Sequence, residues 1–256
     1  MTRILILGGT AEAVEIARRA AALPGADVLY SLAGRTRAPS LPGCALRVGG
    51  FGGAAGLARF LADEAVALVI DATHPYATRM AGNARAACER AGIARLKFLR
   101  PVWEEPAGAV WLDAATAAEA ASLVEGRFGR VFLSIGTKEL AAFSRLANCW
   151  FLVRTVDAPE APLSLPACHT VQARGPFRIE DETALLREHR IDALVTRNSG
   201  GSATAAKLHA AAALAIATVM IARPPVPPGV CYASVDDILM ALRERLAPGD
   251  PGAGMV

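Results

Sequence analysis

Short apolar segments alternate along the chain with alanine-rich segments that carry charges at helical spacing. The first apolar segment, residues 3–7, ends in Gly8-Gly9-Thr10, and residues 11–22 follow as an amphipathic helix. The same alternation predicts further strands at residues 27–32, 46–48, 66–71 and 94–99, with helices at residues 54–63 and 77–91. Strands that alternate with helices in this way are typical of parallel βαβ units.

A Pro- and Gly-containing connector at residues 102–108 interrupts this pattern, which then starts again. The second half predicts strands at residues 110–112, 131–134, 150–153, 170–173, 193–196 and 218–221, with helices at 116–125, 180–189, 203–213 and 235–246. We therefore expect an α/β fold of two Rossmann-like parallel-sheet domains, residues 1–105 and 106–247, with the active site in the cleft between them. The Gly- and Pro-rich tail, residues 248–256, is expected to be disordered.

Composition excludes several other classes. The chain has 256 residues, and although 53% are hydrophobic, its longest uncharged stretch near the C-terminus, residues 210–222, is too short to cross a bilayer. A start without signal-peptide features predicts a cytoplasmic protein without membrane association. A net charge of +3 is too small for a nucleic-acid binder of this size. The five cysteines form no CxxC pair, so we expect free thiols and no metal site.

The turn after the first strand is a candidate phosphate site. Gly8, Gly9, Thr10 and Glu12 lie where a Rossmann domain places a pyrophosphate against the N-terminus of a helix. The full G-x-G-x-x-G fingerprint is absent, and a plain tight turn is the alternative.

The end of the second strand indicates the choice of cofactor. Ser31, Gly34, Arg35 and Arg37 stand where an NAD-binding domain carries an acidic residue, and guanidinium groups suit a 2′-phosphate. This favours NADPH over NADH, although a solvated basic loop would have the same composition.

A second glycine cluster, residues 49–53, directly precedes a predicted helix. Gly50, Phe51 and Gly52 would allow the backbone to approach a bound cofactor closely. A flexible hinge explains the same composition.

Residues 71–77 read Asp-Ala-Thr-His-Pro-Tyr-Ala and follow the buried strand 66–71, so they should lie at the carboxyl edge of the sheet. Thr73, His74 and Tyr76 are the candidates for the reaction centre. The alternative is structural, with Asp71 or Thr73 capping the next helix and Pro75 in its first turn.

The second half carries cations and glycines in several loops that follow strands. If these loops meet at one sheet edge, they would recognise a substrate with several carboxylates or phosphates. Each cation taken singly could equally be a solvated surface residue. The candidates for substrate binding are Lys138, Arg174, Arg197, Ser199, Gly200, Gly201 and Lys207.

The motifs GGTAE, SLAGR, GGFGG, DATHPYA, SIGTK, RGPF, NSGG and IARP, in this order between residue 4 and about residue 224, resemble those of the precorrin-6A reductase family of cobalamin biosynthesis. The resemblance implies NADPH-dependent reduction of one double bond of a polycarboxylate tetrapyrrole-derived ring, giving precorrin-6B, without a metal or flavin. It leaves open whether the ring carries cobalt, which side chain donates a proton, and the oligomeric state.

A glycine-rich first turn also occurs in short-chain dehydrogenases. A short-chain dehydrogenase requires a Lys four positions after its catalytic Tyr, but Met80 occupies that position after Tyr76. A non-catalytic NADP-sensing module that binds a partner protein is the remaining alternative. Such a module would not require the Thr73-His74-Pro75-Tyr76 segment or the cations of the second domain.

Overall fold

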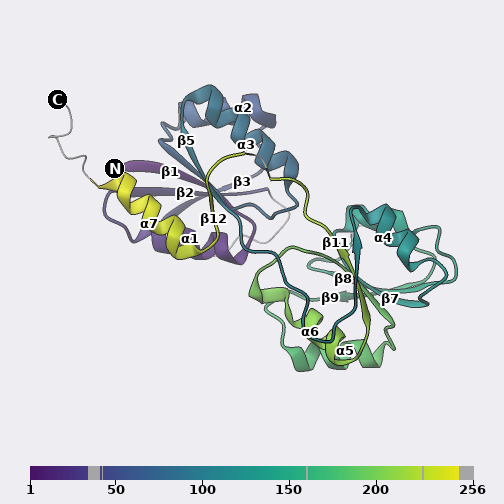
Figure 1. Ribbon diagram of the computed structural model, residues 1–256. Helices are drawn as coiled ribbons and strands as arrows, with labels where there is room; N and C mark the ends of the chain where they lie inside the picture. Colours follow the sequence, from purple (N-terminus) through teal and green to yellow (C-terminus); the bar gives the residue numbers. More distant parts are fainter. Residues whose placement is uncertain (34–40, 42, 160, 227, 248–256) are drawn as a thin grey trace. The chain divides into compact units, whose positions relative to one another are not determined.

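A computed structural model describes residues 1–33, 41, 43–159, 161–226 and 228–247. The chain divides into two compact units (Figure 1). Unit 1 comprises Met1–Arg100 and Pro225–Val256, and unit 2 comprises Pro101–Pro224. The predicted disordered tail, residues 248–256, lies outside the described residues.

Within the described part of unit 1, six parallel strands form one sheet in the order β12-β5-β4-β1-β2-β3. The strands are β1 (Thr2–Leu7), β2 (Ala26–Leu32), β3 (Cys44–Val48), β4 (Leu68–Asp71), β5 (Ala94–Phe98) and β12 (Cys231–Tyr232). The helices are α1 (Ala11–Ala21), α2 (Gly53–Asp63), α3 (Thr78–Ala91) and α7 (Val235–Leu246).

Unit 2 likewise contains a parallel sheet of six described strands, in the order β6-β11-β10-β7-β8-β9. The strands are β6 (Trp111–Ala114), β7 (Arg130–Ser134), β8 (Trp150–Thr155), β9 (Cys168–Gln172), β10 (Ala193–Arg197) and β11 (Ala217–Ile221). The helices are α4 (Ala117–Val124), α5 (Ile179–Glu188) and α6 (Ala206–Ala213), with 3-10 segments η1 (Thr137–Phe143) and η2 (Ser202–Thr204).

The predicted fold class is confirmed, because both sheets are parallel and carry helices between their strands. Five strands of each sheet, β3-β2-β1-β4-β5 and β9-β8-β7-β10-β11, also have the strand order of a doubly wound dinucleotide-binding domain. The edge strand β6 lies in the second unit, as predicted for residues 110–112, but the edge strand β12 of unit 1 comes from an unexpected part of the chain. β6 follows β5 in sequence but pairs with β11, whereas β12 follows β11 but pairs with β5. The chain thus exchanges edge strands between its two units.

The predicted end of the second domain was wrong, because the chain returns to unit 1 after Pro224. The predicted second domain, residues 106–247, included the last helix, but that helix belongs to unit 1. Ile238, Leu239 and Leu242 of α7 are buried in the same core cluster as Ile16 of α1. The two-residue strand β12 was not predicted, since its pairing with β5 joins distant parts of the chain.

The apolar runs of the central strands are buried on both faces, as expected for a parallel sheet. On β1, Ile4 and Ile6 pack in the core with α1 and α7, whereas Leu5 and Leu7 pack with α2 and α3. Alternate residues of one strand therefore supply two different cores, and the strand ends are left to carry the polar loops. None of the described helices has the length and apolar character needed to span a membrane.

The position of α7 can be tested by shortening one of its buried side chains. Leu242 is fully buried, so Leu242→Ala should destabilise unit 1 by roughly 2–5 kcal/mol. All three tryptophans, Trp103, Trp111 and Trp150, belong to unit 2 and report its unfolding by fluorescence. In urea titrations the circular-dichroism transition should therefore begin at lower urea, with the tryptophan transition unchanged.

The control is Met240→Ala on the exposed side of the same helix, where 57% of the residue is accessible. It should change neither transition. A shift of the tryptophan transition alone in Leu242→Ala would contradict the assignment of α7 to unit 1.

Candidate functional site

The loops that follow β1 and β4 lie at the switch point of the unit 1 sheet. β1 pairs with β2 on one side and with β4 on the other, so the chain departs in opposite directions from these neighbouring strands. Ligands of doubly wound proteins bind at this position. The Thr10 hydroxyl joins the two loops, because it accepts from the Ala13 N–H (3.1 Å), which caps α1, and donates to the Ala72 carbonyl (3.2 Å).

The first glycines of the predicted phosphate loop contact Tyr30 of β2. A Cβ on Gly8 would overlap the Tyr30 ring, so only glycine fits at this position. The Gly9 N–H donates to the Tyr30 hydroxyl oxygen at 3.2 Å. Burial raises the pKa of Tyr30, so the phenol stays protonated and neutral. Gly8 and Gly9 thus shape the turn, and the Gly9 N–H already has a partner.

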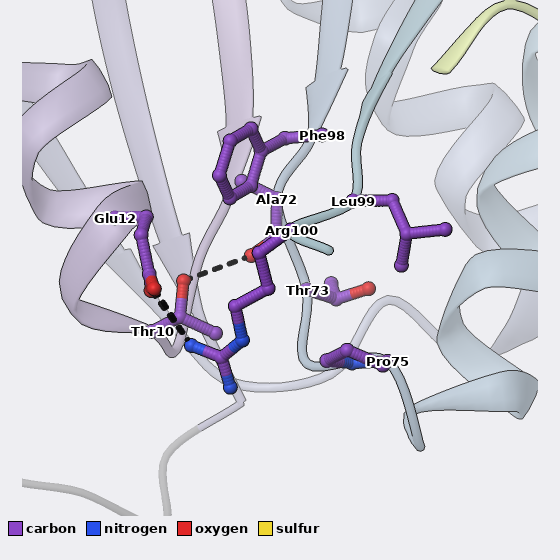
Figure 2. A pocket seen from close by; sticks show the side chains of 8 residues that line it. All are labelled: Thr10, Glu12, Ala72, Thr73, Pro75, Phe98, Leu99 and Arg100. Atoms are coloured by element: carbon purple, nitrogen blue, oxygen red, sulfur yellow. Dashed lines mark hydrogen bonds and ion pairs between the residues drawn. The ribbon is translucent and has the colours of Figure 1, made fainter. Parts of the chain in front are cut away.

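Glu12, a predicted cofactor residue, forms an ion pair with Arg100, which was not predicted as a site residue. One guanidinium nitrogen, Nη1 of Arg100, lies 2.9 and 2.8 Å from the two carboxylate oxygens. Figure 2 shows this pair among the side chains that line a pocket at the strand ends. The pocket is lined by Thr10, Glu12, Ala72, Thr73, Pro75, Phe98, Leu99 and Arg100. A cation directly after the predicted strand 94–99 was the available signal for Arg100.

Thr73 is held by buried charges. Its hydroxyl donates to the fully buried Asp71 carboxylate at 2.7 Å and accepts from the Lys97 ammonium at 3.3 Å. Arg95 binds the other Asp71 oxygen at 3.2 Å. The alternative role of Asp71 or Thr73 as a helix cap is wrong, since α3 begins at Thr78 and its N-cap, Ala77, makes no side-chain cap hydrogen bond.

His74 and Tyr76 lie side by side in the same loop. The Tyr76 N–H donates to His74 Nδ1 at 3.3 Å, and the two ring centroids are 5.8 Å apart. An acceptor role for Nδ1 leaves the proton of the neutral imidazole on Nε2. Both side chains are partly exposed, so a ligand can reach them.

The predicted cofactor residues after β2 and β3 also lie at this edge. The buried Ser31 accepts the Gly8 N–H through its carbonyl at 2.9 Å, which joins the ends of β1 and β2. Near the end of β3, Arg47 donates to the Gly49 and Gly50 carbonyls at 2.6 and 2.8 Å and stacks 3.8 Å from the Phe51 ring centroid. Arg47 therefore holds the Gly50-Phe51-Gly52 loop. Gly34, Arg35 and Arg37 lie outside the described residues.

In unit 2 the corresponding neighbouring loops follow β7 and β10. Arg197, at the end of β10, lies against Gly136, where a Cβ would overlap its guanidinium group. Glu139 holds this guanidinium, with its carboxylate 2.6 Å from Arg197 Nε. Lys138 is exposed in η1 beside this pair in sequence. The structure thus brings Lys138 and Arg197 to adjacent strand ends.

Arg174 follows the edge strand β9 and is about half exposed, with Asp157 3.9 Å away. The segment after it turns back toward η2, since the Phe177 N–H donates to the Ala203 carbonyl at 3.0 Å. Arg174 consequently belongs to the same edge of the unit 2 sheet as the loop at residues 198–202.

Lys207 does not fit the prediction of a substrate-facing cation. It is buried, its ammonium donates to the Thr204 carbonyl at 2.8 Å, and it lies 4.7 Å from the Trp103 ring centroid. Helix α6 places it there because its first turn packs against the connector.

The Ser199-Gly200-Gly201 loop also supports the connector. Gly200 lies against the Pro101 carbonyl, and the Gly201 carbonyl accepts the Trp103 indole N–H at 2.8 Å. Ser199 is buried. Within the described ranges no group of three or more His, Cys, Asp or Glu side chains has a geometry that could hold a metal ion.

The strand orders and these loops define a two-unit, doubly wound α/β protein with polar side chains gathered at the carboxyl edge of each sheet. The chain belongs to the precorrin-6x reductase CbiJ/CobK family, whose model matches residues 3–243. The resemblance inferred from the motifs is confirmed, and the family places the chain among the oxidoreductases.

Similar proteins match along nearly the whole chain. A precorrin-6A reductase of Rhodococcus erythropolis is 48% identical over 94% of this chain and 96% of its own length. A precorrin-6A reductase of Mycobacterium tuberculosis H37Rv is 47% identical over 93% of this chain and 95% of its own. A solved structure of CobK precorrin-6A reductase has a TM-score of 0.90 and 42% identity, and covers 95% of this chain and 97% of that one.

Proposed function

We propose that this protein is an NADPH-dependent precorrin-6A reductase of the cytoplasm, which reduces one double bond of the macrocycle to give precorrin-6B. The observation that carries the proposal is the 48% identity to a precorrin-6A reductase over nearly the full length of both chains. Membership of a reductase family favours this enzyme over the NADP-sensing module.

Unit 1 suits the cofactor. The first N–H groups of α1 have no partners within the helix and favour an anion at its N-terminus. Arg100 adds a cation to the same pocket, and Glu12 orients it. The bound cofactor supplies the hydride. Residues of the β4 loop then orient the reacting groups, and His74 or Tyr76 is chemically able to hold the proton that the reduced ring takes up.

Unit 2 suits a polycarboxylate ring. Lys138, Arg174 and Arg197 come from three loops at one sheet edge, so they can meet carboxylates spread around a large ligand. Glu139 fixes the direction of the Arg197 guanidinium group. Less conformational entropy of this side chain is therefore lost when the substrate binds.

The cobalt-free ring is the better candidate for the substrate. Relatives named cobalt-precorrin-6A reductase are less similar, at 30% identity in Salmonella typhimurium and 28% in Methanothermobacter thermautotrophicus. Purified protein with NADPH should consume precorrin-6A faster than its cobalt complex, which NADPH absorbance and mass spectrometry of the product would measure. If the protein consumed NADPH neither with precorrin-6A nor with its cobalt complex, the proposed function would be contradicted.

The preference for NADPH over NADH can be tested by replacing Arg35. Losing one charge-assisted phosphate contact costs ~1.5–3 kcal/mol, so Arg35→Ala should weaken NADPH binding roughly ten- to a hundredfold and leave NADH binding unchanged. Calorimetric titration of both dinucleotides measures this. The control is Arg18→Ala, an exposed arginine near the C-terminal end of α1. Equal affinity of the wild-type protein for NADH and NADPH would contradict the prediction.

Replacement of Lys138, Arg174 or Arg197 by Ala should each raise KM for precorrin-6A about three- to tenfold, since partly exposed charge contacts contribute ~1 kcal/mol or more. Dissociation of NADPH should not change. Added salt should raise KM further. Arg127→Ala, an exposed arginine before β7 at the opposite sheet edge, is the control. Unaltered KM in all three variants would place the tetrapyrrole elsewhere.

Single-turnover experiments with saturating NADPH can show whether His74 or Tyr76 donates a proton or only shapes the pocket. A positioned proton donor contributes ~10²–10⁴-fold, so its loss in His74→Ala or Tyr76→Phe should slow the chemical step by that factor with ligand binding intact. Wild-type rates in both variants would mean that the loop only shapes the pocket and that water or the substrate supplies the proton.

A further inference from the structure

A cluster of buried charges lies directly beneath the loop at residues 72–77. The Asp71 side chain is inaccessible, and the side chains of Lys97 and Arg95 are only 4% and 9% exposed. Lys97 binds one Asp71 oxygen at 3.0 Å, and Arg95 binds the other at 3.2 Å. Asp71 and Lys97 are direct neighbours on β4 and β5, which fixes this contact through strand register.

Stability alone does not account for such a cluster. Charges removed from water lose their hydration, and well-packed apolar side chains in the same place are often equally or more stabilising. The rest of β4 is apolar and buried, and Lys97 lies between the buried Leu96 and Phe98 on β5, so an apolar pair at these two positions would continue the pattern. A buried pair of this kind needs a second reason, and its contacts with Thr73 supply one.

Asp71 and Lys97 together fix residue 73. One Asp71 oxygen accepts both the Thr73 N–H (3.2 Å) and the Thr73 hydroxyl (2.7 Å), and the Lys97 ammonium donates to that hydroxyl. From the other side, Thr10 donates to the carbonyl of Ala72. The backbone that enters the His74-Pro75-Tyr76 segment is therefore held at two consecutive residues.

We propose that Lys97 and Asp71 are positioning residues for the reduction, which set the geometry of His74 and Tyr76 through Thr73. Thr73 belongs to this support, because its hydroxyl donates a hydrogen bond to Asp71 and accepts one from Lys97. The proposal rests on the proposed function. Neither Lys97 nor Asp71 touches the ligands, and their contribution is the orientation of the loop above them.

Arg95 provides a matched control because it shares Asp71 but not Thr73. Its guanidinium contacts the second Asp71 oxygen and the Pro228 carbonyl (3.4 Å). Loss of Arg95 removes a buried charge partner of the same carboxylate, so it tests the structural role of the cluster by itself.

The experiment compares Lys97→Met with Arg95→Gln in single-turnover reduction of precorrin-6A by NADPH. An error of about 1 Å in the placement of reacting groups costs on the order of a hundredfold, so Lys97→Met should slow hydride transfer and kcat about a hundredfold. KM for precorrin-6A and the NADPH dissociation constant should stay within about threefold. Arg95→Gln should lower the unfolding temperature but leave the chemical step within about threefold of wild type.

The double variant Asp71→Asn/Lys97→Met separates folding from positioning. In Lys97→Met the Asp71 carboxylate keeps Arg95 as a partner, whereas the double variant also takes this carboxylate from Arg95, so its unfolding temperature should lie below that of Lys97→Met. A rate that followed stability would fall further in the double variant, but a rate set by the position of Thr73 would be the same in both. Hydride transfer should remain slow, because the ammonium no longer holds Thr73. Wild-type rates in the double variant, or in a folded Lys97→Met protein, would overturn the proposal.

A second measurement does not depend on turnover. Amide hydrogen exchange in residues 72–77 should be faster in Lys97→Met and in the double variant than in wild type, and unchanged in Arg95→Gln. Unchanged exchange in the double variant would overturn the positioning role. Failure of the wild-type protein to reduce either ring would instead contradict the proposed function, so the two failures are distinguishable.

Discussion

The parallel pairing of β1 with both β2 and β4 determines where the loops that follow β1 and β4 begin. Parallel strands bring all their carboxyl ends to one edge, and the opposite departures of the chain from β1 and β4 separate the loops there. The Thr10 hydroxyl bonds across this point to Ala72. Gly8 and Tyr30, the Glu12–Arg100 pair and the Asp71 cluster all depend on this arrangement, because each joins the ends of different strands.

Both units combine a glycine turn with an acid that holds an arginine. Residues 9–12 read Gly-Thr-Ala-Glu and residues 136–139 read Gly-Thr-Lys-Glu, each directly after the first strand of its doubly wound order. In unit 1 the glutamate binds Arg100, and in unit 2 it binds Arg197. An acid that orients a guanidinium group also reduces its net charge, so an incoming anion must compete with a partner already present. Such a pair favours ligands that approach from the correct direction.

The exchange of edge strands makes unit 1 depend on two separate segments of the chain, whereas unit 2 is continuous. β6 and β12 complete the sheet that does not contain the preceding strand, and α7 covers unit 1 although it follows all of unit 2 in sequence. In unit 2, Asn198 and Arg223 hold the connector at Pro101 and Trp103 beside the Ser199-Gly200-Gly201 loop. Residues predicted only for substrate binding therefore also anchor the connecting segment.

Local pattern was sufficient to predict most strands and helices, since an apolar run followed by a glycine turn and an amphipathic segment is visible within a short window. α7 was predicted with its observed bounds, and the loops that follow β1 and β4 were recognised as the candidate site. The motifs of this sequence also identified its family. Only the tertiary structure decided which side chains contact one another. The burial of Lys207, the pairing of Glu12 with Arg100 and the contact of Lys97 with Thr73 each join residues whose environments depend on strand order and register. The sequence pattern reports whether a side chain is polar, but only the packing of distant segments determines whether that polar group meets solvent, a ligand or a buried charge.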